Sequence, residues 1–467
     1  MARSNANANA NAKSDDVEDG TRICGGLGAS PGSVTGPARV FSDPDAADTV
    51  EDGDIIVTEM TMPQMVPAMK RAAGIITDEG GITCHAAIVS RELGVPSVVG
   101  TDIATESIAD GQWVSLDGEK GSVTTATEDE HTAGLRQDGT NGESRTGDAG
   151  PDESTESIAS EAPVSPPSAT ATGVKVNVSI PDAAERAADT GADGVGLLRL
   201  EHILLSMRKT PRRYVDDHGE AAFVETVADE IKRVADAFYP RPVRARTLDA
   251  PTDELAELEG GEDEPHEHNP MLGWRGIRRS LDEPELAKLE LRAFKRLHDM
   301  GYDNIEVLFP LPNDPEEVVA AREMMRDVGI DPDDRRRGVM IETPASFYQI
   351  EDIIDTGIDF VALGTNDLVQ YILAVDRNNG QVADQFDEMH PAVLDAMGQV
   401  IDACNEHDVD TTITGQAGSK PEMARFLVKK GISSVSANID AVDEVRGIIE
   451  RAEQRMLLEA ARSDRLD

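Results

Sequence analysis

Six- or seven-residue apolar, β-rich runs alternate with amphipathic stretches between residues 174 and 439. Short apolar runs are typical of strands buried on both faces, and stretches such as ELAKLELRAFKRLHDM have helical spacing. Eight such alternations over about 285 residues predict a (β/α)8 barrel in an α/β chain, with an open doubly wound sheet as the alternative. The runs are VKVNVSI (174–180), GVGLLRL (194–200), VRARTLD (243–249), IEVLFPL (305–311), GVMIET (338–343), FVALGT (360–365), TTITGQ (411–416) and SVSANI (434–439).

Residues 22–126 follow a different pattern, in which short β-rich runs alternate with turns. One helix is expected from about Cys84 to Leu93, and WVSLDGEKGSVTT predicts a hairpin. We expect a separate α+β domain here. Residues 127–172 have the Ser-, Thr-, Gly- and acid-rich composition of a flexible acidic linker spanning roughly 35–40 Å, and residues 1–21 that of a disordered tail. The barrel is then expected over 173–460.

The chain of 467 residues carries 89 acidic and 44 basic side chains, a net charge of -45. Such a surface repels nucleic acid and anionic membranes, so neither is expected as a partner. Adaptation to high salt explains the charge better than an ordinary acidic surface, because salt screens the self-repulsion. No apolar run of membrane-spanning length or secretory signal is apparent, and the three cysteines form no CxxC pair. These features favour a cytoplasmic protein.

Polar side chains end most of the predicted barrel strands. In a barrel, catalytic groups gather at the carboxyl ends of the strands, so we expect these side chains to meet at one mouth. Any single one could instead cap a loop. They are Arg199, Arg246 with Asp249, Glu342, Asn366 with Asp367, Gln416 and Asn438.

Arginine and carboxylate side chains dominate this predicted mouth. Arginine forks bind phosphate and carboxylate groups, and Mg2+ is commonly held by one or two carboxylates together with substrate oxygens. The inventory therefore indicates phosphoryl or enolate chemistry in general. Its members are Arg199, Arg246, Arg275 and Arg377, with Glu342 and Asp367 as the carboxylates.

A histidine motif stands out in the N-terminal region, within TDEGGITCHAAIVSRELGVPSVVGT (77–101). Gly80 and Gly81 permit a tight turn, and Thr83 is a suitable N-cap, which would put His85 in the first helical turn. A helix start favours an incoming phosphoryl group, and a neutral imidazole is a competent nucleophile. On chemistry alone, a purely structural histidine is the alternative.

The complete motif closely resembles the mobile phosphohistidine domain of phosphoenolpyruvate-utilising enzymes, whose pattern is GG-x-[TS]-[CS]-H-[AT]-[AS]-I followed by RELG-[IV]-P-A-[IV]-VG. The similarity covers 22–126, including GLGASPGSVTGPARVF. It implies that His85 is the catalytic phosphoryl acceptor. Thr83 resembles a threonine that a regulatory enzyme phosphorylates in bacterial relatives, although a helix cap is the simpler interpretation.

The barrel resembles the phosphoenolpyruvate-binding barrel of the same family, through GVGLLRLEH, RTLD, NPMLGWRGIR, GVMIETPA, LGTNDLVQYILAVDRNNG and ITGQAGS. The resemblance implies a phosphotransferase acting between phosphoenolpyruvate or pyruvate and His85, with Mg2+ as cofactor, and it allows a homodimer through the barrel. Arg275 could instead pair with Arg278 on a helix surface. The implied roles are substrate binding for Arg199, Arg246, Arg275, Asn366 and Arg377, and metal binding for Glu342 and Asp367.

Two departures from the family pattern limit these expectations. The family has an acid/base cysteine where this chain has Thr414, and a hydroxyl is a poor base, so proton transfer to or from the methyl carbon of pyruvate is in question. Cys404 lies in a helical run and is a poor substitute. Synthases and dikinases of the family also carry an ATP-grasp domain before the phosphohistidine domain. We therefore expect a separate ATP-grasp partner, and a non-turnover, phosphoenolpyruvate-binding regulatory protein is the alternative.

Overall fold

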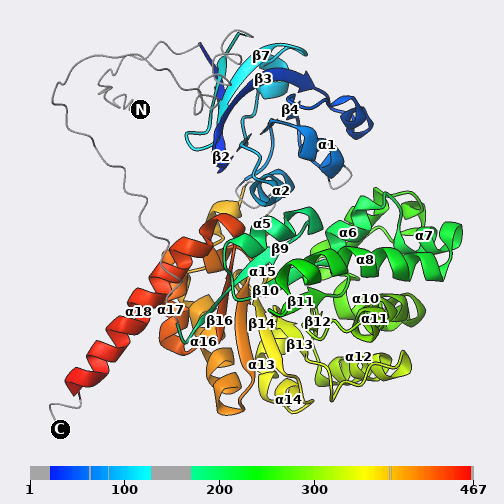
Figure 1. Cartoon of the computed structure of the whole chain (residues 1–467), viewed down its shortest axis with the longest axis vertical. Coiled ribbons are helices and arrows are strands. Elements are labelled where there is room, and N and C mark those ends of the chain that lie inside the picture. Colours follow the sequence, from blue (N-terminus) through cyan, green and yellow to red (C-terminus); the bar gives the residue numbers. More distant parts are fainter. Residues whose placement is uncertain are drawn as a thin grey trace, which may run out of the picture.

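The computed structural model describes residues 21–62, 65–81, 84–127, 170–377, 379 and 381–463. They form an N-terminal unit, residues 21–127, and a barrel, residues 170–463, which stand one above the other with helix α2 between them (Figure 1). Nearly all of the predicted tail and linker lies outside the described residues.

The N-terminal unit is built on one mixed sheet of eight strands in the order β1-β8-β7-β3-β4-β5-β6-β2. Strands β3, β4, β5 and β6 pair in parallel, and the other pairs are antiparallel. The expected hairpin is present as β7 and β8. The elements are β1 Arg22–Gly25, β2 Leu27–Ser30, β3 Ser33–Val40, β4 Ile55–Thr58, α1 Val66–Arg71, β5 Gly74–Thr77, α2 His85–Leu93, β6 Ser97–Val99, α3 Ala104–Ser107, β7 Trp113–Asp117 and β8 Ser122–Thr125.

Helix α2 begins one residue later than the sequence suggested. Its N-cap is Cys84, with extended backbone angles and no side-chain cap hydrogen bond, so the prediction of Thr83 as the cap was wrong. Thr83 itself lies outside the described residues. The helix ends at Gly94, whose φ of 72° is the left-handed conformation that glycine adopts without strain. His85 is therefore the first residue of the helix.

The second unit is a closed barrel of eight parallel strands in the order β10-β11-β12-β13-β14-β15-β16-β9, which confirms the barrel and excludes the open sheet. Short apolar runs become its strands because both of their faces are covered. The strands are β9 Gly173–Val178, β10 Val195–Arg199, β11 Val243–Arg246, β12 Ile305–Phe309, β13 Arg337–Ile341, β14 Phe360–Gly364, β15 Asp410–Thr414 and β16 Ser434–Ala437.

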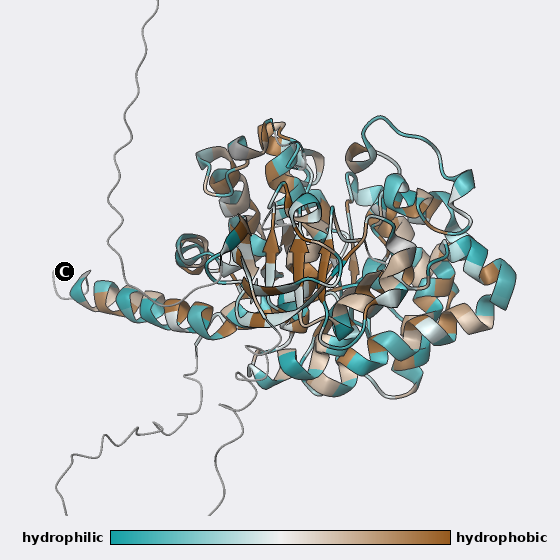
Figure 2. Ribbon diagram, turned by 90° about the horizontal axis from the view of Figure 1, so that it is seen from above, coloured by the Kyte–Doolittle hydropathy of each residue, from teal (hydrophilic) through white to brown (hydrophobic). Residues whose placement is uncertain are grey.

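Helices surround the barrel, and in Figure 2 the strands are coloured mainly as hydrophobic while the helices carry both hydrophobic and hydrophilic residues. Apolar residues from the strands and the helices form one buried cluster. Leu197, Leu308, Met340, Phe360 and Ala362 form a smaller buried cluster of their own. No helix in the described ranges is long and apolar enough to cross a membrane. The helices are α5 Ala184–Asp189, α6 Leu200–Ser206, α7 Pro211–His218, α8 Glu220–Phe238, α9 Thr252–Ala256, α10 Gly276–Asp282, α11 Pro284–Asp299, α12 Pro315–Asp327, α13 Pro344–Tyr348, α14 Ile350–Ile354, α15 Thr365–Leu373, α16 Pro391–Glu406, α17 Pro421–Lys430 and α18 Val442–Ser463.

The two units make specific contacts where α2 meets the end of β9. Glu92 Oε2 accepts hydrogen bonds from the backbone N–H groups of Ser179, at 2.7 Å, and Ile180, at 2.9 Å. Arg186 of the barrel donates to the carbonyl oxygens of Arg91 and Glu92. The side chain of Ile180 is buried within an apolar cluster that otherwise belongs to the N-terminal unit. These contacts hold α2 against the barrel.

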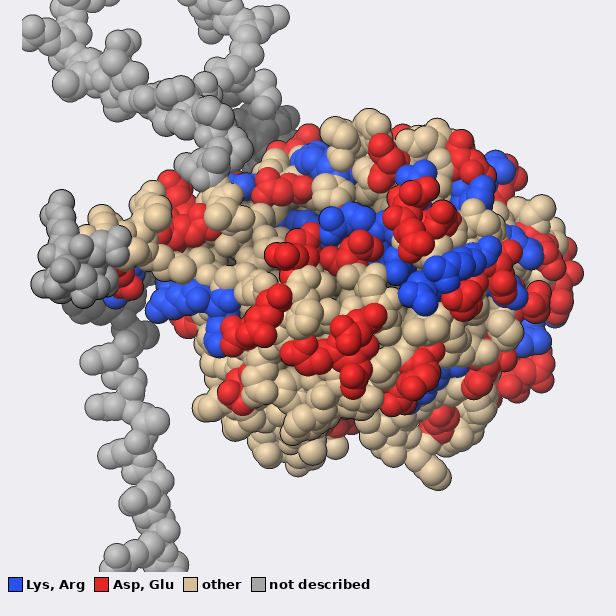
Figure 3. All heavy atoms as spheres, turned by 90° about the horizontal axis from the view of Figure 1, so that it is seen from below, with Lys and Arg blue, Asp and Glu red and all other residues tan. Residues whose placement is uncertain are grey.

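The surface carries the acidic excess of the sequence. Figure 3 shows acidic side chains spread over the face seen from below, with basic side chains interspersed among them. Many of these charges form exposed ion pairs within one or two helical turns, such as Lys295 with Asp299. Exposed pairs of this kind contribute little to stability.

Candidate active site

The polar residues predicted to end the barrel strands lie at one end of the barrel. Arg199 and Arg246 are the last residues of β10 and β11 and are direct neighbours in the parallel register. Glu342 directly follows β13, Asp367 lies in the first turn of α15 after β14, and Thr414 ends β15. The all-parallel topology brings these carboxyl ends to the same mouth.

A chain of buried ion pairs runs across this mouth. Arg246 pairs with Glu201, the second residue of α6, at 3.0 Å and with Asp249 at 3.0 Å. Arg275 holds both oxygens of Asp249, at 2.6 and 2.9 Å, and reaches Asp367 at 3.2 Å. All five side chains are largely buried. The site is therefore an ordered charge network, and the alternative of Arg275 on a helix surface is wrong.

The network shifts the pKa of its members in opposite directions. Burial alone would lower the pKa of Arg246 and of Arg275, but the neighbouring carboxylates outweigh burial and raise both. Burial would raise the pKa of Asp367, but Arg275 and Arg377 outweigh it and keep that pKa below its usual range. Both arginines and Asp367 are therefore charged at neutral pH.

Glu342 differs from the other site carboxylates, because burial, Asp249 and Asp367 together raise its pKa well above the usual range. Its Oε1 accepts a hydrogen bond from the backbone N–H of Leu311 at 2.9 Å. Asp367 Oδ1 is buried and accepts no hydrogen bond from the described residues, and Arg377 Nη2 stands 3.9 Å away from it. A cation would relieve both the carboxylate repulsion and the unsatisfied oxygen.

The donor set at Glu342 and Asp367 fits a magnesium ion that completes its shell with substrate oxygens and water. Among the residues that the structure describes, no group of three or more His, Cys, Asp and Glu side chains is arranged to hold a metal ion. The mouth thus offers a carboxylate pair, not a closed cage, and an open shell leaves room for a substrate.

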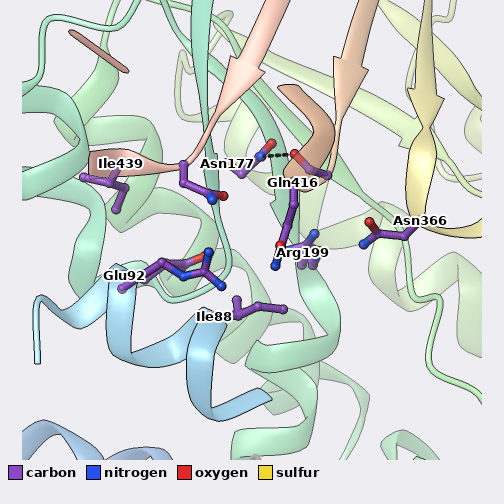
Figure 4. Close-up of a pocket in the computed structure, with 10 residues that line it drawn as sticks. Ile88, Glu92, Asn177, Arg199, Asn366, Gln416 and Ile439 are labelled. Atoms are coloured by element: carbon purple, nitrogen blue, oxygen red, sulfur yellow. Dashed lines mark hydrogen bonds between the residues drawn. The ribbon is translucent and has the colours of Figure 1, made fainter. Parts of the chain in front are cut away.

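A small pocket lies between α2 and the barrel mouth (Figure 4). Ile88 and Glu92 approach it from α2, while Arg199, Asn366 and Gln416 approach it from the barrel. Arg199 Nη1 donates a hydrogen bond to Ser179 Oγ at 2.7 Å. Burial lowers the pKa of Arg199, and the positive charge of Arg246 nearby lowers it further. An anionic ligand would be favoured beside this buried cationic group.

His85 stands where the N-terminal unit meets this mouth. Its Nδ1 is 2.8 Å from Thr61 Oγ1, while its Nε2 is buried and has no hydrogen-bond partner among the residues that the structure describes. Its ring lies parallel to that of His202 of α6, with ring centroids 5.9 Å apart and an interplanar angle of 9°. Burial lowers the pKa of His85 to about 4, so the imidazole is neutral at pH 7. A neutral ring with a free Nε2 is available as a nucleophile.

Thr414 is buried, and its hydroxyl donates to the Leu363 carbonyl oxygen at 3.2 Å. Its own carbonyl oxygen accepts from Thr365 Oγ1 at 2.9 Å. Cys404 lies on α16, where burial raises its pKa to about 12, so it cannot supply a thiolate near neutral pH.

Four residues of the site were not identified from the sequence. Glu201 and His202 directly follow the predicted strand 194–200, and polar residues immediately after a strand end could have suggested both. Thr61 contacts His85, and Glu92 joins α2 to the barrel, through segments far apart in the chain. Neither contact leaves a periodic signal in the sequence.

Known proteins share both units. Residues 154–454 match the PEP-binding domain of PEP-utilising enzymes, and residues 50–121 match the mobile domain of PEP-utilising enzymes. The chain is 51% identical to the phosphoenolpyruvate synthase of Pyrococcus furiosus over 95% of its length and 52% of that protein. It is also 51% identical to a probable phosphoenolpyruvate synthase of Archaeoglobus fulgidus, over 95% of this chain and 56% of that protein.

A third relative, the probable phosphoenolpyruvate synthase of Methanocaldococcus jannaschii, is 53% identical over 80% of this chain and 30% of that protein. The chain thus spans about half, or less, of the length of these curated relatives. The match to the PEP-binding domain alone covers more than half of this chain. The chain belongs to the PEP-utilising enzyme family.

Proposed function

We propose that this chain transfers a phosphoryl group between phosphoenolpyruvate and His85, as one half of a phosphoenolpyruvate synthase-like reaction. The observation that carries the proposal is the buried, unpartnered Nε2 of His85 beside His202, three residues after Arg199 at the barrel mouth. A phosphoryl acceptor needs a free lone pair next to cationic groups that hold the donor, and this arrangement offers both.

In the proposed reaction the substrate phosphate and carboxylate are held by the arginines of the mouth. Arg199 and Arg246 are adjacent strand ends, and Arg377 lies near Asp367 across the mouth. The Nε2 electron pair of His85 forms the bond to phosphorus, and the bond from phosphorus to the enol oxygen breaks. Its electron pair stays on that oxygen as enolate. The proposal places the imidazole proton on Nδ1, 2.8 Å from Thr61 Oγ1, where it stays throughout.

We further propose that Glu342 and Asp367 hold Mg2+, which would offset negative charge on substrate oxygens. Asn366, beside Asp367, lines the pocket and can donate an amide hydrogen bond to the substrate. Arg275 does not need to touch the substrate in this proposal. Its place between Asp249 and Asp367 lets it fix both carboxylates.

The other half of a synthase reaction, phosphorylation of His85 from ATP, would take place on a nucleotide-binding domain other than the two units described above. That domain could belong to a longer chain or to a separate ATP-grasp subunit. Docking of α2 on the barrel must then be reversible, because His85 cannot lie at the barrel mouth and at the nucleotide-binding site at the same time.

Thr414 favours a second candidate, a phosphoenolpyruvate-binding protein that reports metabolic state through phosphorylation of His85 without turnover. The Thr414 hydroxyl already donates to Leu363, and a hydroxyl is far less acidic than a thiol. The two candidates differ in one product. Turnover releases pyruvate in step with each phosphorylated histidine, whereas a sensor would hold the enolate and return it.

Incubation with phosphoenolpyruvate labelled with 32P, in the presence of Mg2+, tests the proposal. We expect an acid-labile, base-stable phosphoprotein that is absent in His85→Ala and retained in His407→Ala, a surface histidine on α16's C-terminal side. Labelling that survives His85→Ala would refute the assignment of the acceptor. Pyruvate measured in the same samples separates turnover from sensing.

A further inference from the structure

Two stacked histidines at the domain boundary each have a buried ring nitrogen without a hydrogen-bond partner among the described residues. His85 Nε2 and His202 Nδ1 are both inaccessible to solvent and form no hydrogen bond with any described residue. Their rings are parallel, with centroids 5.9 Å apart. Buried polar atoms without partners are rare, because desolvation is not repaid. A pair of them at one site indicates a polar ligand that is shared between the two rings.

The surroundings of His202 define what kind of ligand that is. Burial lowers the pKa of His202 well below its usual range, and His85, Arg199 and Arg246 lower it further. His202 is therefore a neutral imidazole among cationic groups, with one ring N–H to donate. An N–H donor surrounded by arginines suits an anion with several acceptor oxygens, and a phosphoryl group is such an anion.

We propose that His202 Nδ1 donates a hydrogen bond to an oxygen of the phosphoryl group while that group moves between phosphoenolpyruvate and His85 Nε2. This inference rests on the proposed function and adds a residue to it. His202 forms no covalent bond. The bond made is from His85 Nε2 to phosphorus, the bond broken is from phosphorus to the enol oxygen, and the His202 proton stays on its nitrogen throughout.

The hydrogen bond should be strongest when the three phosphoryl oxygens are held between the two sites. There the arginines still contact the group and the new bond to Nε2 is forming. His202 is thus expected to assist transfer more than it assists phosphoenolpyruvate binding, because the bound substrate already has Arg199 and Arg246. The rate of transfer and the affinity for substrate should therefore respond differently to substitution.

Two substitutions separate the nitrogen from the ring. His202→Phe keeps the stacked shape and removes the donor, whereas His202→Asn places an amide N–H close to the former Nδ1. We expect single-turnover labelling of His85 by phosphoenolpyruvate to fall about 10- to 100-fold in His202→Phe, since hydrogen bonds to charged groups are strong. His202→Asn should retain labelling within a few-fold of the unmodified chain.

His298→Phe is the matched control. His298, on α11, is also a buried barrel histidine whose Nδ1 has no hydrogen-bond partner among the described residues. Its Nε2 lies 3.3 Å from the carbonyl oxygen of Ile305, the first residue of β12, and therefore at the end of the barrel opposite the mouth. The His298→Phe substitution should leave the rate of His85 labelling unchanged. Phosphoenolpyruvate affinity measured by calorimetry should stay within about threefold in all variants, and the 31P resonance of phosphorylated His85 should shift only in His202→Phe.

Equal labelling rates in the unmodified chain and His202→Phe would overturn the inference. An equal loss in His202→Phe and His202→Asn, with the 31P resonance unmoved, would overturn it as well, because the ring and not the donor would then matter. Failure of the unmodified chain to become labelled would count against the proposed function itself. Thermal unfolding of each variant shows whether the barrel has remained intact.

Discussion

Replacing Glu92 by alanine removes the carboxylate that joins α2 to the end of β9. In the docked arrangement, Glu92 Oε2 is the acceptor for the Ser179 and Ile180 N–H groups, at 2.7 and 2.9 Å. Without it, both donors remain buried and unsatisfied for as long as the units stay together. Undocking returns them to water, so the loss falls on docking and not on the folding of either unit.

The size of the effect follows from these two hydrogen bonds. Leaving a buried donor unsatisfied costs about 1–3 kcal/mol, and water entering the boundary offsets part of that for two adjacent donors. We therefore expect Glu92→Ala to weaken docking by about 1–3 kcal/mol, roughly a 5- to 150-fold fall in the docked-to-undocked ratio. Ile180→Ala should cost a further ~2–5 kcal/mol, because its side chain is buried in the N-terminal unit's cluster.

Spin labels at Ser107 and Asp299, both exposed and one on each unit, report docking as a single narrow distance. We expect Glu92→Ala to broaden the distance distribution and to slow labelling of His85 by saturating phosphoenolpyruvate. Glu106→Ala, at an exposed glutamate on α3, is the matched control. A Glu92→Ala, Ile180→Ala double variant that keeps the narrow distance would refute the role given to both contacts.

Glu92→Gln gives a separate test through pH. Burial raises the pKa of Glu92, and the hydrogen bonds from Ser179 and Ile180 lower it by less. A raised pKa in the docked state means that docking takes up protons. The stabilisation is full below the pKa of a free glutamate and is lost as pH rises through the raised docked value. Docking should thus weaken with rising pH in the unmodified chain, and this dependence should disappear in Glu92→Gln.

Three further outcomes are expected. Thr414→Cys should accelerate exchange of solvent deuterium into the methyl group of pyruvate by at least about tenfold while leaving His85 labelling unchanged, and fast exchange before the substitution would show that another residue moves the proton. Arg275→Met should lower the free energy of unfolding by about 3–5 kcal/mol in urea titrations, since it leaves two buried carboxylates without their arginine, and the half-buried Arg278, which forms no ion pair among the described residues, gives the control Arg278→Met. Glu342→Gln should weaken Mg2+ binding, measured by calorimetry with phosphoenolpyruvate present, by at least about tenfold, and unchanged binding would place the metal elsewhere.

The barrel could be predicted from the sequence because each strand has a recognisable pattern of apolar residues within its own short segment. A run such as FVALGT is apolar throughout, as buried parallel strands are, and the residue that ends it is fixed at the mouth by topology alone. Arg199, Arg246 and Asp367 could therefore be assigned to one site before any coordinates were known. Their pairing could not, since Arg246 meets Glu201 across 45 residues and Arg275 meets Asp367 across 92.

The boundary between the units was beyond sequence reasoning for a related reason. Glu92 and Ser179 are 87 residues apart, and each has an adequate local explanation, one as a helix residue and the other as a strand end. Ile180 likewise continues the apolar pattern of a barrel strand, yet its side chain is buried in the other unit. Apolar periodicity says that a residue is buried, and it does not say against which domain.

In the proposed reaction, the phosphoryl step and the proton step would use different parts of the mouth, and only the groups for the phosphoryl step are all present. Ion pairs link the charge network from Glu201 to Asp367, and His85 lies beside His202 with an Nε2 that has no hydrogen-bond partner among the described residues. On the opposite strand end, the Thr414 hydroxyl is committed to the backbone of β14. Electrostatic preorganisation suffices to move a phosphoryl group, since the enolate left behind is stabilised by fixed charges. Moving a methyl proton requires a group that titrates near the working pH, and at that position the chain has none.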